Sequence, residues 1–117
     1  MLLNEHYRFQ PNSAFKRLDR LNNKRLNAYD LATFLRDNGY NYYSVDLGDL
    51  VRAYDGDNDG HLDVKEFAKI IVSATDVVLQ KRAYERYEEY IGFRDRLAPD
   101  VERGITMILL KEIESLK

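Results

Sequence analysis

Six residues within a segment of twelve have the types and spacing of a site for a hard divalent cation. They are Asp55, Asp57, Asp59, His61, Asp63 and Glu66. Such cations bind oxygen atoms, and Ca²⁺ takes about six to eight of them. Carboxylates at alternate positions can converge on one ion when the backbone curls around it, and Gly60 permits the positive φ that a sharp bend needs. The segment therefore predicts a site for one Ca²⁺ ion per chain.

The six residues would reach the ion in different ways. Each of the first three aspartates would supply a carboxylate oxygen, and Asp63 would bind directly or through a water molecule. His61 would offer its backbone carbonyl, so its imidazole is incidental. Glu66 would close the site with both carboxylate oxygens from the first turn of the next helix, while Leu62 points away from the ion into the core.

With these features the segment closely resembles the calcium loop of the EF-hand family. An amphipathic helix is predicted to end at Tyr54 and another to begin at Asp63, so the flanks also agree with a helix–loop–helix unit. An exposed acidic turn without an ion is one alternative, and a calcium loop of an extracellular repeat module is another. The density of carboxylates, together with Gly60 and Leu62 at the required offsets, disfavours the first. The strong helix leading into the loop disfavours the second.

EF-hands usually occur in pairs, so the resemblance implies a second unit along the chain. An upstream segment matches when Leu26 is placed at the register of Leu62, an offset of 36 residues. Asp19 then falls opposite the first ligand and Asp30 opposite the last, and the apolar positions of the flanking helices repeat as well. The hydrophobic frame of the unit is therefore present twice.

Most of the ligands are absent from the upstream segment. Leu21 replaces the second ligand, Lys24 replaces the glycine of the bend, and Arg25 follows it. Asp30 is one carbon shorter than a glutamate and reaches an ion less easily with both oxygens. We therefore interpret residues 13–38 as a degenerate EF-hand kept for pairing, with an unrelated helix–turn–helix as the alternative.

The apolar periodicity predicts an all-α fold of about six helices. Residues 13–74 would form the EF-hand pair of four helices, with the degenerate unit in 13–38 and the calcium-binding unit in 44–74. Residues 1–12 would be an N-terminal extension, and residues 75–117 a C-terminal extension with two further helices.

Local signals indicate where these helices begin. Ser13 is predicted to cap the first helix, and Asn27, with Asp30 in the first turn, to cap the second. Pro99 would be the first residue of the last helix. The predicted helices begin near Ser13, Asn27, Ser44, Asp63, Thr75 and Pro99.

The C-terminal extension carries two apolar stripes. One is rich in tyrosine, and the other follows the last helix through Val101, Ile105, Ile108, Leu109, Ile113 and Leu116. The stripes could pack on each other as a hairpin, fill an apolar groove of the calcium-loaded pair, or meet another protein; packing within the chain is the favoured interpretation. Residues 97–112 also resemble a segment of EF-hand proteins of protist cilia and cytoskeleton, which implies a protein partner and such a location.

The formal net charge of −2 conceals a segregation along the chain. Residues 1–40 carry +3, residues 41–66 carry −5, and residues 67–117 are neutral, so the calcium loop lies in a concentrated anionic patch. The basic excess includes Lys16, Arg17, Arg20, Lys24 and Arg25. These side chains could dock an acidic partner or neutralise the neighbouring loop, but we favour the solvated face of a short helix and its loop.

The composition argues against several other functions. The 117 residues include no cysteine and two histidines, which excludes a thiolate metal site and disfavours a zinc site. A sequence pI near 5.7 disfavours a nucleic-acid partner, and no apolar run is long enough for a membrane span. The N-terminus shows no secretory signal, so we expect a cytoplasmic location. No nucleophile–base pair or phosphate-binding glycine run is present, so we do not expect an enzyme.

The sequence therefore predicts a calcium-responsive protein-interaction module with an unidentified protein partner. One alternative is a structural EF-hand adaptor with a permanently bound Ca²⁺ or Mg²⁺ ion. The other is a regulatory domain of a larger enzyme.

Overall fold

The computed structural model describes residues 9–41, 44–71, 81, 83–86, 91 and 95–116. Within these ranges every regular element is a helix, which confirms the predicted all-α class. The helices with defined bounds are α1 (Pro11–Leu18), α2 (Ala28–Asp37), α3 (Ser44–Tyr54), α4 (Val64–Ile71) and α6 (Pro99–Ser115). Among the described helices, none has the length and apolarity that crossing a membrane requires.

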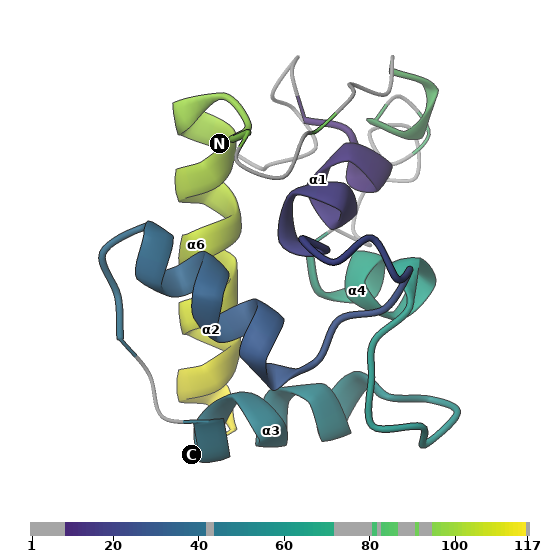
Figure 1. Ribbon diagram of the computed structural model, residues 1–117, viewed down its shortest axis with the longest axis vertical. Coiled ribbons are helices and arrows are strands. Elements are labelled where there is room, and N and C mark those ends of the chain that lie inside the picture. Colours follow the sequence, from purple (N-terminus) through teal and green to yellow (C-terminus); the bar gives the residue numbers. More distant parts are fainter. Residues whose placement is uncertain are drawn as a thin grey trace.

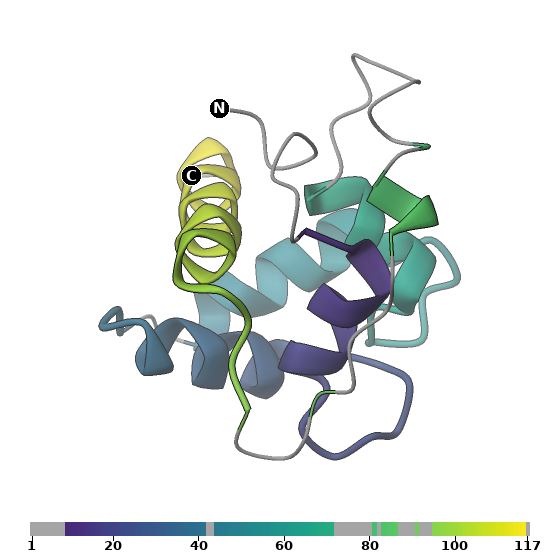
Figure 2. The same ribbon diagram turned by 90° about the horizontal axis from the view of Figure 1, so that it is seen from above.

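The first four helices form two helix–loop–helix units that pack on each other (Figure 1). Helix α1 contacts α2 and α4, and α3 also contacts α2 and α4. An edge-to-face contact joins Phe15 of α1 to Phe67 of α4, with 6.0 Å between the ring centroids. Helix α6 packs against α3 and α4, and Figure 2 looks almost along its axis, where it lies at one side of the other helices.

The start of α1 differs from the prediction. The helix begins at Pro11, two residues earlier than expected, and Gln10 is its N-cap. The Gln10 side chain accepts a hydrogen bond of 2.8 Å from the Ser13 amide, so Ser13 is capped and is not itself the cap. Proline is suited to the first helical position because its fixed φ is helical and its missing N–H would have had no partner there.

The start of α2 and the bounds of α3 agree with the prediction. Asn27 accepts a hydrogen bond from the Asp30 amide at 2.9 Å, and the Asp30 carboxylate accepts one from the Asn27 amide at 3.0 Å. These reciprocal bonds satisfy two amides that the first turn of a helix leaves unpaired. Gly39 has a φ of 89°, a conformation that ends a helix and that glycine adopts without strain.

The apolar stripe of α6 is part of the core. Val101, Ile105, Leu109 and Ile113 are buried, while Leu116 is exposed. Because α6 contacts α3 and α4, this stripe covers apolar surface of these two helices, and the predicted hairpin with the tyrosine-rich stripe stays a prediction. The predicted helix that begins near Thr75 falls largely outside the described residues.

Candidate metal centre

The loops of the two helix–loop–helix units lie side by side and share a pair of hydrogen bonds. The Leu26 amide donates to the Leu62 carbonyl at 2.8 Å, and the Leu62 amide donates to the Leu26 carbonyl at 2.7 Å. Both leucine side chains are fully buried. The structure therefore pairs the two residues that the 36-residue offset aligned, which confirms that register.

The acidic side chains of the second loop gather as the spacing predicts. Two groups of three residues have carboxylate oxygens that all lie within 4.8 Å of one another, and the groups share Asp57. They are Asp55 with Asp57 and Asp59, and Asp57 with Asp63 and Glu66. The structure thus brings together all the predicted carboxylate ligands. The ring of the sixth residue, His61, lies with its Nδ1 at 3.0 Å from the Asp59 carbonyl oxygen.

Asp55 shapes the first half of this loop. Its two carboxylate oxygens accept hydrogen bonds from the Asp59 amide at 3.2 Å and from the Gly60 amide at 2.7 Å. Gly60 has a φ of 82°, so the bend uses the left-handed conformation that favours glycine. The chain consequently curls around the carboxylate at the start of the loop.

Glu66 closes the loop from the first turn of α4. Its Oε2 accepts a hydrogen bond of 2.5 Å from the Gly56 amide, and its Oε1 accepts one of 3.0 Å from the Asp63 amide. Asp63 in turn accepts from the Glu66 amide at 2.8 Å, so the pair forms the predicted capping arrangement at the start of the helix. Glu66 is buried, and its carboxylate reaches back across the loop to a residue beside Asp55.

Crowding of these carboxylates changes their affinity for protons. A hydrogen bond from Asp57 to Asp55, together with the nearby charges of Asp59 and Glu66, raises the pKa of Asp57 to about 6. Desolvation acts to raise the pKa of Asp55, but hydrogen bonds from the Gly60 amide and from Asp57 outweigh it and lower that pKa. The loop therefore holds excess negative charge that a divalent cation would neutralise.

The first loop follows the same path without the same ligands. Asp19 accepts hydrogen bonds from the Asn23 amide at 3.1 Å and from the Lys24 amide at 2.8 Å, at the same offsets as in the second loop. Lys24 has a φ of 64° at the position of Gly60, although a lysine adopts this conformation with strain. The local hydrogen bonds of the buried Asp19 carboxylate thus maintain the bend in this loop.

The side chains of the first loop do not form a ligand cluster. Leu21, at the position of the second ligand, is 68% exposed, and Lys24 and Arg25 are exposed cations. Among the described residues, no group of three ligating side chains gathers in this loop. Its shape matches the second loop while its chemistry does not suit a cation.

Two residues of the basic cluster are placed differently from the favoured interpretation. Arg20 is partly buried and pairs with Asp37 at 3.6 Å, and Arg17 departs further. Lys16 is exposed, but Arg17 is fully buried, so the prediction of a solvated basic face is wrong at this position. The Arg17 guanidinium donates to both carboxylate oxygens of Glu102 on α6, at 2.7 and 3.0 Å, and to Asp37 at 3.2 Å. It also lies over the Phe34 ring, 4.9 Å from its centroid.

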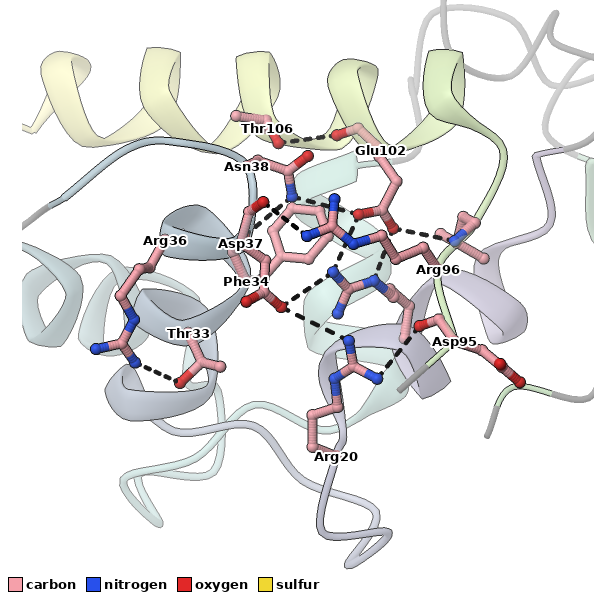
Figure 3. A network of polar contacts seen from close by, with 12 residues as sticks. Arg20, Thr33, Phe34, Arg36, Asp37, Asn38, Asp95, Arg96, Glu102 and Thr106 are labelled. Carbon is pink, nitrogen blue, oxygen red and sulfur yellow. Dashed lines mark hydrogen bonds and ion pairs between the residues drawn. The ribbon is translucent and has the colours of Figure 1, made fainter. Parts of the chain in front are cut away.

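Glu102 is the acceptor at the centre of this network (Figure 3). It is 4% exposed, and besides Arg17 it accepts hydrogen bonds from the Asn38 side chain at 3.3 Å and from the Leu97 amide at 3.1 Å. One sequence signal points to the burial of Arg17. It lies three residues after Ala14, which is buried on α1, so the two residues share a face of the helix. The position of Arg17 within a run of basic residues does not identify Glu102 as its partner.

No family model matches the sequence, and no curated protein matches it. The loop of residues 55–66 gathers several carboxylate oxygens, which carry concentrated negative charge. This donor set suits a hard cation such as Ca²⁺ or Mg²⁺.

Proposed function

We propose that the protein binds one Ca²⁺ ion in the loop of residues 55–66, and that its two helix–loop–helix units are an EF-hand pair with a degenerate first loop. The observation that carries this proposal is the gathering of the five carboxylates, with Glu66 already positioned across the loop from Asp55. The ligands would be Asp55, Asp57, Asp59, the His61 carbonyl, Asp63 and Glu66. Cysteine is absent, and carboxylate oxygens favour hard cations over transition metals.

The pairing of the loops supports the EF-hand part of the proposal. Leu26 and Leu62 join the loops, and both bends are built from an aspartate that accepts hydrogen bonds from amides four and five residues later. We propose that the pair acts as a calcium-responsive module for a protein partner. A location in the cytoplasm, at a cilium or on the cytoskeleton stays a prediction, and so does a role as the regulatory domain of a larger enzyme.

A structural role for the ion is the second candidate, and the position of α6 favours it. The buried stripe of this helix already covers apolar surface of α3 and α4, which a calcium sensor would need to expose. Fluorescence of a hydrophobic dye with and without Ca²⁺ separates the candidates. An increase in fluorescence with Ca²⁺ supports a module that exposes a docking surface. An unchanged signal supports a permanently bound structural ion.

Calorimetric titration of the ion-free protein is expected to show one Ca²⁺ ion per chain. The five acidic ligands place the dissociation constant between about 10⁻⁸ and 10⁻⁵ M, and a parallel titration with Mg²⁺ measures selectivity. One site is expected because Lys24 and Arg25 repel a cation from the first loop. A stoichiometry of two would contradict the degenerate interpretation, and no binding would contradict the proposed function.

Calcium affinity is expected to fall as the pH is lowered from about 7.5 to about 5. In the ion-free loop the pKa of Asp57 is about 6, so below that pH the ion must displace a proton from a ligand. The affinity should then decrease by up to about tenfold per pH unit. Titration at pH 6 in two buffers of different ionisation enthalpy measures the released proton.

Asp57→Asn is the matched variant for this experiment. It should bind Ca²⁺ more weakly but release fewer protons near pH 6, because the titrating carboxyl is gone. An affinity that is the same at both ends of the pH range in the wild-type protein would contradict the displacement of a proton from Asp57 by the ion.

A further inference from the structure

Helix α6 is tied by polar contacts to both helix–loop–helix units, at opposite ends. Near its N-terminus, Glu102 accepts hydrogen bonds from Arg17 on α1 and from Asn38 at the end of α2. Glu112 lies about 15 Å further along the helix axis. Its Oε2 accepts a hydrogen bond of 2.8 Å from the hydroxyl of Tyr54, the last residue of α3. The helix therefore bridges the unit without ligands and the unit with them.

The two attachments are unequal. Glu102 is 4% exposed and receives four hydrogen bonds, two of them from a buried guanidinium, so loosening it would leave charges unpaired in the core. Glu112 is half-buried and its contact with Tyr54 is a single hydrogen bond from a neutral donor. Of the two attachments, the one at the C-terminal end can therefore yield more easily.

The weaker attachment adjoins the candidate metal loop. Tyr54 directly precedes Asp55, and Glu66 on α4 already reaches the Gly56 amide. An ion held between Asp55 and Glu66 would join the end of α3 to the start of α4. Because α6 packs on both of these helices, an ion in the loop would also restrain the Tyr54 hydroxyl beside Glu112.

We propose that the Tyr54–Glu112 hydrogen bond relays the state of the metal loop to the C-terminal half of α6, with the Arg17–Glu102 pair as the fixed point. This inference rests on the proposed calcium binding. When Ca²⁺ is bound, the last turns of α6 are held on α3; without it they open more often, and the fixed end keeps the helix on the domain. The regulated surface is then the end of α6, rather than the whole helix.

Hydrogen exchange of the full chain, followed by mass spectrometry with Ca²⁺ or with a chelator, tests the relay. Amides of residues 109–116 are expected to exchange at least about threefold more slowly with Ca²⁺, and those of residues 101–105 to change by less than about twofold. In Tyr54→Phe the difference at residues 109–116 should disappear, while the calcium affinity from calorimetry stays within about threefold. Tyr29→Phe, at an exposed tyrosine of α2, is the matched control and should keep the response.

The outcomes separate this inference from the function on which it rests. Calcium binding without a change at residues 109–116, or a change that persists in Tyr54→Phe, would overturn the relay and leave the metal site intact. An equal loss of response in Tyr29→Phe would also overturn it. If the wild-type chain bound no Ca²⁺ in the calorimeter, both proposals would be wrong.

Discussion

Calcium affinity should fall by about two orders of magnitude or more in Glu66→Gln, and by a similar factor in Asp55→Ala. Among the proposed ligands, Glu66 is the one expected to offer two oxygens, and glutamine keeps only one of them and no charge. Asp55 is the first carboxylate of the loop, and its oxygens also shape the bend through the Asp59 and Gly60 amides. Titration calorimetry of each purified variant measures the change.

A control is needed for the loss of negative charge itself. Asp49→Asn removes the same charge from an exposed site on α3 outside the loop, and its calcium affinity should stay within about threefold of the wild-type value. Circular dichroism of the ion-free variants checks that the helices persist. Unchanged calcium binding in both Glu66→Gln and Asp55→Ala would show that the ion, if any, lies elsewhere.

Removal of one member of the buried Arg17–Glu102 pair should destabilise the protein by about 3–5 kcal/mol. Arg17→Met leaves the Glu102 carboxylate buried without its charged partner, and Glu102→Leu leaves the guanidinium with only the partly exposed Asp37. The large expected effect comes from this unpaired buried charge. The attraction within the intact pair does little more than offset the free-energy cost of removing both charges from water. Urea unfolding of the ion-free protein measures the free energy of unfolding.

The double variant Arg17→Met/Glu102→Leu distinguishes this mechanism from a simple loss of packing. With both charges gone, most of the stability should return, to within about 1–2 kcal/mol of the wild-type protein. Arg25→Met, an exposed residue of the same basic cluster, should change stability by less than about 0.5 kcal/mol. Additive losses in the double variant would show that the two side chains act independently.

The candidate metal loop could be predicted because its geometry depends on neighbours in the chain. Asp55 finds its amide donors four and five residues away, and Asp63 caps α4 by accepting from the Glu66 amide three residues later. Contacts of this range depend on residue type and spacing, which a single sequence displays. The pairing of Leu26 with Leu62 was also accessible, because an internal repeat with the same apolar frame implies the same register.

Other local features were less well determined. Ser13 and Gln10 are both able to cap a helix, and the choice between them depended on Pro11, whose ring is suited to the first helical position. The stripe of α6 predicted a buried face, but it did not specify whether α3 and α4 or a tyrosine-rich helix would cover it. Amphipathicity indicates that a face is buried and carries little information about its partner.

The sequence by itself determined an all-helical chain with one concentrated set of oxygen donors and an upstream loop that lacks most of them. Only the tertiary structure decided that Arg17 lies in the core and not on the basic surface. It also decided that α6 bridges the two units through Glu102 and Glu112. The reason is the range of the interactions: Arg17 meets an acceptor 85 residues away. A charge is buried only when folding brings its counter-charge to it, and the local pattern around Arg17 does not identify that counter-charge.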